Sequence, residues 1–215
     1  MKYYLNGVSF DTYGVKVKTS QGMLDALELK APLSLDWEGY HGMEVDLSAP
    51  RYGVRTITLE CFTLAVDKSA SVQKLTEFFH ELSKSGTHRL MIDTGESKPL
   101  VYEVYRQGSV KTERIWQGGV NVGVFTLELI EPNPIKKVYK HVRTTTANKT
   151  ATLTITSEKE VTVFWGDGAK TEARGTDILL SHDYTKNGTY YIVIAGVIEE
   201  IGAITTNATL VWNLL

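Results

Sequence analysis

The residue types that could do chemistry are few in this chain, and their spacing does not suit a reaction. Ser181, His182 and Asp183 follow one another and supply the residue types of a hydrolase triad. Neighbouring residues of a strand point to opposite faces, so these three cannot form a relay in which a histidine lies between a carboxylate and a nucleophile. No G-x-S-x-G, Walker A or H-E-x-x-H sequence accompanies them. We therefore predict no catalytic residue in this segment.

Acidic side chains form a second pattern of chemical interest. A carboxylate pair held at a suitable separation hydrolyses glycosidic bonds, and four carboxylates gather between residues 36 and 46. A solvated acidic loop accounts for them equally well. Two further aspartates, Asp167 and Asp183, lack the spacing of an EF-hand calcium loop. The sequence thus predicts that the protein binds no metal or cofactor and is not an enzyme. An enzyme is the third hypothesis, after the two described below. The four carboxylates are Asp36, Glu38, Glu44 and Asp46.

Cysteine and histidine usage limits the chemistry further. The five histidines include no i, i+4 pair, and the single cysteine, Cys61, excludes an intramolecular disulfide and a cysteine-rich zinc site. Cys61 lies in an alternating stretch, residues 58–64, that is typical of a strand. This pattern predicts a small buried side chain and not a nucleophile.

Length and charge exclude several other classes of function. The 215 residues allow one large or two modest domains, and a net charge of −2 gives no basic footprint for sequence-specific nucleic-acid binding. No apolar segment approaches the length of a transmembrane helix, and residues 1–8 lack the apolar region of a signal peptide. We expect no membrane insertion, and a chain that stays in the cytoplasm until it is assembled or released.

The C-terminal third has the turns and aromatic residues of a small β-sandwich. Residues 161–164 are β-branched or aromatic, and Gly166-Asp167-Gly168 then breaks the run, which predicts a hairpin. Asn187-Gly188 is a second turn signal of the same kind. Residues 190–194 are largely apolar on both faces, as in a central strand. Tyr184 is placed like a tyrosine whose hydroxyl closes a sandwich corner.

These residues resemble the PKD-like, immunoglobulin-type domains, in which W-G-D-G is followed by H-x-Y and then by G-x-Y. The resemblance implies an immunoglobulin-like β-sandwich over residues 136–215 that acts as a spacer or a binding module. It also implies that the matching residues mainly hold the fold. The matching residues are Trp165, Gly166, Asp167, Gly168, His182, Tyr184, Gly188 and Tyr190.

The first part of the chain predicts strands around one helix. Helical spacing in Val72, Leu75, Phe78, Phe79 and Leu82 indicates a helix of about four turns with one apolar face against a sheet. Ser69 or Ser71 would cap its start and Gly86 would stop it. The predicted strands span residues 3–10, 13–18, 55–66, 89–92, 100–106, 110–117 and 120–130.

Two glycine or proline signals punctuate this part. Gly118-Gly119 suits the turn of a hairpin between the last two strands. Pro132 and Pro134 cannot lie in a central strand, so we place a boundary there, with one domain at residues 1–135 and a second at residues 136–215.

Residues Glu38–Tyr52 differ from both domains because they contain glycine and proline but few periodic apolar residues. We predict a long loop or an arm. Long loops in compact domains are usually functional, so this segment is the best candidate for a contact between subunits. The candidate contact residues are Tyr40, His41, Met43, Arg51 and Tyr52.

The order of these elements is similar to that in the N-terminal domain of siphophage distal tail proteins, which themselves resemble tail-tube subunits. The resemblance implies a mainly β protein: a β-sandwich or barrel-like tail-tube-related domain with one packed helix, then the immunoglobulin-like sandwich. It implies a hexameric ring in the virion tail, with tail-tube, tape-measure and baseplate proteins as partners. It is carried by residues 5–8, 13–15, 55–59, 86–93 and 123–129, and by the helix with Leu75 and Phe78.

Two functional hypotheses lead. The first is a non-catalytic structural protein of a phage or prophage tail tip, which is made in the host cytoplasm and closes into a ring through sheet edges and the arm. A near-neutral or acidic lumen would let DNA pass without binding. The alternative is a bacterial surface-type module that recognises a carbohydrate, such as a host-surface glycan, or a protein through the PKD-like domain. Exposed aromatic residues such as Trp165 or Trp212 would favour this alternative.

Overall fold

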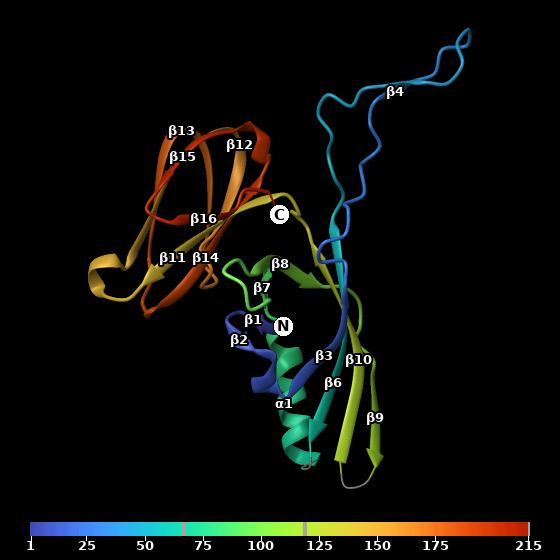
Figure 1. Cartoon of the computed structure of the whole chain (residues 1–215), viewed down its shortest axis with the longest axis vertical. Coiled ribbons are helices and arrows are strands. Elements are labelled where there is room, and N and C mark those ends of the chain that lie inside the picture. Colours follow the sequence, from blue (N-terminus) through green and yellow to red (C-terminus); the bar gives the residue numbers. More distant parts are fainter. Residues whose placement is uncertain (66–67, 118–119, 215) are drawn as a thin grey trace.

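The computed structural model describes residues 1–65, 68–117 and 120–214 of the chain. The protein is mainly β, as the sequence predicts, and its strands form two large antiparallel sheets and a two-stranded ribbon (Figure 1). One α-helix, α1 (Lys68–Glu81), lies against the N-terminal sheet.

The N-terminal sheet has the order β2-β1-β7-β8-β10-β6-β3, and β9 pairs with β10. Strand β10 is a central strand of this sheet and pairs with three others. It pairs with β6 along its length, with β9 near its start and with β8 near its end. The strands are β1 (Lys2–Leu5), β2 (Val8–Ser9), β3 (Val15–Gln21), β6 (Arg55–Ala65), β7 (His88–Asp93), β8 (Leu100–Arg106), β9 (Thr112–Gln117) and β10 (Val120–Glu131).

The predicted strands are confirmed for β6, β8 and the β9–β10 pair, whose Gly118-Gly119 connector lies outside the described residues. The predicted strand over residues 3–10 is wrong. Asn6-Gly7 makes a two-residue turn, β1 and β2 form a hairpin, and a 3-10 helix (Phe10–Tyr13) follows. Asn-Gly is a strong hairpin signal, and the sequence analysis overlooked it.

Helix α1 closes the N-terminal core. Leu75, Phe78 and Leu82 are buried against strands of both halves of the sheet, as predicted, whereas Val72 is exposed at the margin of that face. The predicted cap is wrong, because Ser69 and Ser71 both lie inside the helix. Serine is tolerated in a helix interior, and the buried apolar face packs this helix against the sheet.

The C-terminal sheet has the order β13-β12-β14-β11-β16, and β15 pairs with β12. Its longest strand, β12, pairs with β15 up to Ser157 and with β14 from Val161 onward, and its register shifts between Ile155 and Val161. The sheet therefore folds over its own core, as bulged strands allow. The strands are β11 (Lys136–Arg143), β12 (Thr150–Phe164), β13 (Lys170–Asp183), β14 (Gly188–Gly196), β15 (Ile201–Thr206) and β16 (Thr209–Trp212).

Two turn predictions in this sheet have different outcomes. Gly166-Asp167-Gly168 does connect β12 to β13 as a hairpin, with both glycines at positive φ and the Asp167 carboxylate accepting the Ala169 N–H at 3.1 Å. Asn187-Gly188 leads into β14, which is central as predicted. It does not form a hairpin, because β12 lies between β13 and β14.

Residues 22–54 form the arm, which projects from the ends of β3 and β6 away from both sheets (Figure 1). Its two sides are joined by the short ribbon of β4 (Ser34–Leu35) and β5 (Glu44–Val45) and by an isolated bridge between Leu29 and Tyr52. The arm is therefore an ordered double strand, and it is longer than the predicted Glu38–Tyr52 segment.

The two large sheets contact each other directly. Four valines make a small buried cluster between them, and the indole N–H of Trp212 donates to the Pro99 carbonyl at 2.8 Å. Every strand of the first sheet precedes residue 132 and every strand of the second follows residue 135. This separation supports the two-domain division, which stays our proposal. The valines are Val101, Val138, Val193 and Val211.

Candidate functional site

The arm is the candidate site, because it exposes apolar side chains that the rest of the chain leaves uncovered. Not one of its residues is buried. Within the described residues, 11 of the 21 exposed large apolar side chains lie in the arm. So many exposed apolar side chains in one segment make it a candidate for an interaction surface. They are Leu24, Leu29, Leu33, Leu35, Trp37, Tyr40, Met43, Val45, Leu47, Tyr52 and Val54.

The tip of the arm brings together three of the predicted contact residues: Tyr40, His41 and Met43. Tyr40 is 80% exposed and Met43 is 62% exposed. A turn in which the Tyr40 N–H donates to the Trp37 carbonyl at 3.0 Å orders the tip. Trp37, which the sequence analysis did not select, is 53% exposed and anchored by an indole N–H donated to Glu44 at 3.3 Å. Aromatic and methionine side chains are the types enriched in protein–protein interfaces.

The other two predicted contact residues lie at the root of the arm. Arg51 forms ion pairs within the same chain, at 3.5 Å to Glu199 and at 3.3 Å to Glu200. Tyr52 makes the backbone bridge to Leu29. The structure thus separates Arg51 and Tyr52 from the tip, and Arg51 already has partners in the C-terminal sheet region. We keep only Tyr40, His41 and Met43 in the proposed subunit contact.

Charge also distinguishes the arm from the body. Residues 22–54 contain six Asp or Glu and two Lys or Arg, a net charge of −4. The whole chain has a net charge of −2, so the other residues sum to +2. An acidic arm on a mildly basic body is electrostatically complementary to another copy of the same body.

The four arm carboxylates do not form an acid–base pair. Asp46 accepts the Ser48 N–H at 2.9 Å, and this bond lowers the pKa of the Asp46 carboxyl. A general acid in a glycosidase needs a raised pKa instead. The Glu44 carboxylate accepts a hydrogen bond from the Trp37 indole N–H. We therefore interpret Asp36, Glu38, Glu44 and Asp46 as a solvated acidic surface.

The predicted fold-signature residues come together at one end of the C-terminal sheet. Trp165 is buried, its ring stacks on His182, and its indole N–H donates to Thr171 at 2.9 Å. His182 lies 2.7 Å from the Asp167 carboxylate. The hydroxyl of buried Tyr184 donates to the Trp165 carbonyl at 2.8 Å. Every one of these contacts has a packing explanation, and none leaves a group free for chemistry.

The corner contact differs from the prediction in one respect. Tyr184 bonds to a residue 19 positions earlier, across the sheet. The short-range bond that a tyrosine corner makes belongs to Tyr190, whose hydroxyl donates to the Lys186 carbonyl at 2.7 Å. The two tyrosine rings stack with centroids 3.7 Å apart, directly beside the Gly188 end of β14.

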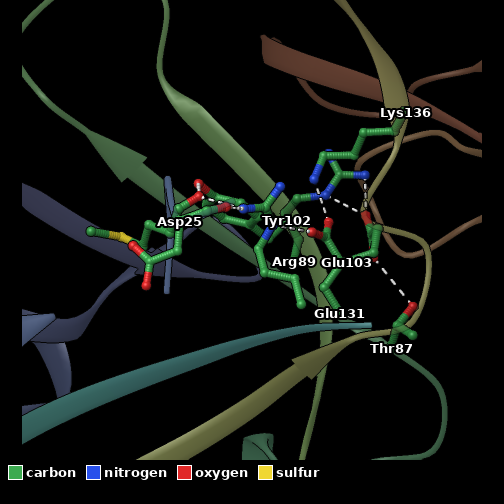
Figure 2. Close-up of polar contacts among 9 residues, drawn as sticks. Asp25, Thr87, Arg89, Tyr102, Glu103, Glu131 and Lys136 are labelled. Carbon is green, nitrogen blue, oxygen red and sulfur yellow. Dashed lines mark hydrogen bonds and ion pairs between the residues drawn. The ribbon is translucent and has the colours of Figure 1, made fainter. Parts of the chain in front are cut away.

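Sequence reasoning missed a group of buried charges where the two sheets meet (Figure 2). Glu131 ends β10, Lys136 begins β11, and neither side chain is more than 1% exposed. Lys136 pairs with one oxygen of Glu131, and Arg55 donates to the other at 3.1 Å. Nearby, Arg89 pairs with Glu103 and also donates to the Tyr191 carbonyl of β14. Charged residues in sequence suggest surface, so no pattern indicated this group.

Burial dominates the electrostatics of this group. It raises the pKa of the Glu131 carboxyl, while the Lys136 ammonium and the Arg55 guanidinium oppose the rise. Burial also lowers the pKa of Lys136, to about 8, against the attraction of Glu131. A buried charge without its partner is far more costly than the pair, so each member depends on the others.

A polar cavity of about 520 Å³ lies between the end of α1 and the Gly166–Lys170 turn. Its charged groups already have partners: Glu81 accepts from Lys84 and from Asn6, and Arg89 pairs with Glu103. The bonds from Lys84 and Asn6 lower the pKa of Glu81. Since a general acid or base near neutral pH needs a raised pKa, we assign no chemistry to this cavity.

The remaining candidates for chemistry are also unsuited to it. Cys61 is buried, and burial raises the pKa of its thiol to about 12. Among the described residues, no three His, Cys, Asp or Glu side chains are placed to hold a metal ion. No helix in the described ranges is long and apolar enough to cross a bilayer.

Comparison with solved structures gives a weak match. The chain is similar to the crystal structure of the SPP1 Dit (gp 19.1) protein, described as a paradigm of the hub adsorption apparatus in phages that infect Gram-positive bacteria. The sequence identity is 11% and the TM-score is 0.48, over 89% of this chain and 78% of that chain. No protein-family model matches the chain, and no curated protein matches it at a significant level.

Proposed function

We propose that the chain is a non-catalytic structural protein of a phage or prophage tail tip, which assembles with copies of itself into a ring. The exposed apolar surface of the arm is the observation that carries this proposal. A double strand without a buried residue gains little from its own fold. It is stabilised when a partner covers its apolar side chains.

The arm and its binding surface would make a heterologous interface, in which one patch of a subunit meets a different patch of the next. Such an interface closes into a ring when the rotation between subunits permits. The acidic arm and the mildly basic body favour this head-to-tail arrangement over an arm–arm contact, because two arms of net charge −4 repel each other. The sequence resemblance to distal tail proteins supports a ring of six.

The same resemblance supports the wider assignment. In this proposal the ring lies in the virion tail after assembly in the host cytoplasm, with tail-tube, tape-measure and baseplate proteins as neighbours. The C-terminal sheet would project from the ring as a PKD-like spacer.

The structure does not favour the alternative of a glycan-binding module. Trp165 is buried, and Trp212 lies with its indole N–H bonded to Pro99 and with the Lys98 ammonium 5.4 Å above its ring. These two residues therefore do not form the flat aromatic platform that the alternative predicts.

Mass measurement and negative-stain imaging of the purified chain test the proposal. We expect a discrete ring-shaped oligomer for the native chain. A triple variant with Trp37, Tyr40 and Met43 changed to Ser should be a folded monomer. A native chain that stays monomeric at high concentration would overturn the proposal, and so would a triple variant that forms the same ring.

A further inference from the structure

We propose that the Glu131 carboxylate is the centre of a three-way joint that fixes the direction of the arm relative to both sheets. The inference concerns contacts within one chain, and it does not depend on ring formation. Three parts of the molecule that are distant in sequence meet at this carboxylate: the N-terminal sheet, the root of the arm and the first strand of the C-terminal sheet (Figure 2).

The first part is the N-terminal sheet, which supplies both Glu131 and Arg55. These residues face each other in the register of β10 and β6, and each lies at the end of its strand from which the arm or the connector leaves. The Arg55 Nε–H donates to Glu131 at 3.1 Å, and both side chains are buried. A guanidinium group bound to a carboxylate has a defined orientation. The bond from Nε to Glu131 therefore fixes the direction in which the Nη1 of Arg55 donates.

The second part is the arm root. The Nη1 of Arg55 donates to the Met23 carbonyl at 2.9 Å, and the Asp25 carbonyl lies 3.5 Å from the same nitrogen. The Tyr102 hydroxyl donates to Met23 as well, at 2.9 Å. Two side chains of the N-terminal sheet therefore hold one backbone carbonyl just after the chain leaves β3.

The third part is the C-terminal sheet, which reaches the joint through Lys136. Its ammonium pairs with Glu131 and lies 4.5 Å from the centre of the Tyr102 ring. Tyr102 thus contacts the arm root with its hydroxyl and the C-terminal lysine with its ring face. The connector between Glu131 and Lys136 has four residues, 132–135, and two of them are prolines, so the chain passes from one sheet to the other at the joint.

The joint is more deeply buried than a second connection between the arm and the C-terminal sheet region. The other, Arg51 with Glu199 and Glu200, is exposed by 39–51% on all three side chains. Exposed pairs of this kind stabilise little because water and salt screen them. The buried joint therefore sets the arm direction, and Arg51 adds to it.

Glu131→Gln tests the joint, and Glu103→Gln is its matched control. Both replace a buried carboxylate that pairs with an arginine, but the Glu103 carboxylate accepts from Thr87 and Arg89, which lie outside the arm. Hydrogen exchange of residues 23–26 is one readout. The second is the distance distribution between spin labels at Gly39→Cys in the arm and Lys159→Cys in the C-terminal sheet. Spin-labelled protein is diluted with unlabelled protein, so that distances within one chain are measured.

We expect Glu131→Gln to speed exchange at the arm root by ~100-fold and to broaden the distance distribution, because it leaves two buried cations without a full acceptor. Glu103→Gln should leave the exchange of residues 23–26 unchanged. A folded Glu131→Gln protein with native exchange and a native distribution would overturn the joint, and so would equal effects of the two variants on the exchange of residues 23–26.

Arg55→Lys gives a second test if Glu131→Gln does not fold. Lysine keeps the positive charge beside Glu131 but lacks the fork that reaches Met23 at the same time. Faster exchange confined to the arm root supports the joint. Native exchange at residues 23–26 in this variant contradicts it.

Discussion

The two tryptophans Trp37 and Trp165 show how differently the arm and the C-terminal sheet use the same residue type. Trp165 is 1% exposed and stacks on His182, and a neighbouring tyrosine holds its carbonyl. Trp37 is 53% exposed, and its indole N–H donates to Glu44. The C-terminal sheet covers its aromatic surface within the chain, whereas the arm leaves its own uncovered. One region uses its tryptophan for stability, and we propose that the other uses it for contact with a partner.

The largest effect should come from the buried tryptophan. Trp165→Ala removes a ring that is buried in the C-terminal core and should lower the free energy of unfolding by about 3–5 kcal/mol. Chemical denaturation measures the loss. Trp37→Ala is the control, and we expect it to change stability by less than ~0.5 kcal/mol. Equal losses for the two tryptophans would show that the arm packs like a core.

Substitution of one glycine at the arm root and one at the arm tip should affect stability differently. Gly22 and Gly42 have nearly the same φ, +82° and +80°, but a Cβ on Gly22 would lie 1.9 Å from the Thr56 carbonyl oxygen and one on Gly42 would meet nothing within 4 Å. Gly22→Ala should cost about 2–4 kcal/mol through strain and overlap. Gly42→Ala strains only the tip, so the global transition should stay within ~0.5 kcal/mol. Thermal denaturation of both variants checks this difference.

Two tyrosines test the corner of the C-terminal sheet at finer scale. Tyr184→Phe leaves the buried Trp165 carbonyl without its donor and should cost about 1–2 kcal/mol. Tyr190→Phe removes a more exposed bond to Lys186, and its cost should be smaller, at ~0.5 kcal/mol. Urea denaturation of the two variants gives the order. A larger loss of stability for Tyr190→Phe than for Tyr184→Phe would show that the Tyr190 hydroxyl, and not the Tyr184 hydroxyl, stabilises this corner.

The smallest effect is a pH dependence that differs between the two regions. Bonds from Lys149 and Thr150 lower the pKa of Asp183 below its unfolded value of 3.8. Its contribution is therefore present above that value and is lost as the pH falls through the folded pKa. Asp183→Asn should flatten the acid side of the melting-temperature profile. Asp46 has a lowered pKa as well, but Asp46→Asn should leave the profile unchanged because the arm contributes little to global stability.

Several features of the fold could be predicted because they depend on local pattern. Strand β6 alternates, the helix around Phe78 has helical spacing, and Gly166-Asp167-Gly168 has the chemistry of a turn. The missed hairpin at Asn6-Gly7 was also local, and the signal was present in the sequence.

The rest depends on contacts between distant residues, which no local pattern contains. Glu131 and Lys136 flank a proline-containing connector and look like surface charges, but the two sheets enclose them. Arg51 is a predicted subunit contact, but in the structure it forms ion pairs with Glu199 and Glu200 of the same chain. These residues are far away in sequence, 149 positions for Glu200, so no local pattern shows the pairing. The arm was recognised from its composition, but its exposed tryptophan was not.

Site-specific photo-crosslinking tests the central claim most directly, because it asks what the arm tip touches. A benzophenone amino acid at Tyr40 reports on the tip, and the same group at Leu179, which is 69% exposed on the C-terminal sheet, is the control. We predict covalent pairs of chains from Tyr40 in the purified protein and few from Leu179. Equal yields at the two positions, or no pairs from Tyr40, would contradict the proposal that the arm binds another copy of this chain.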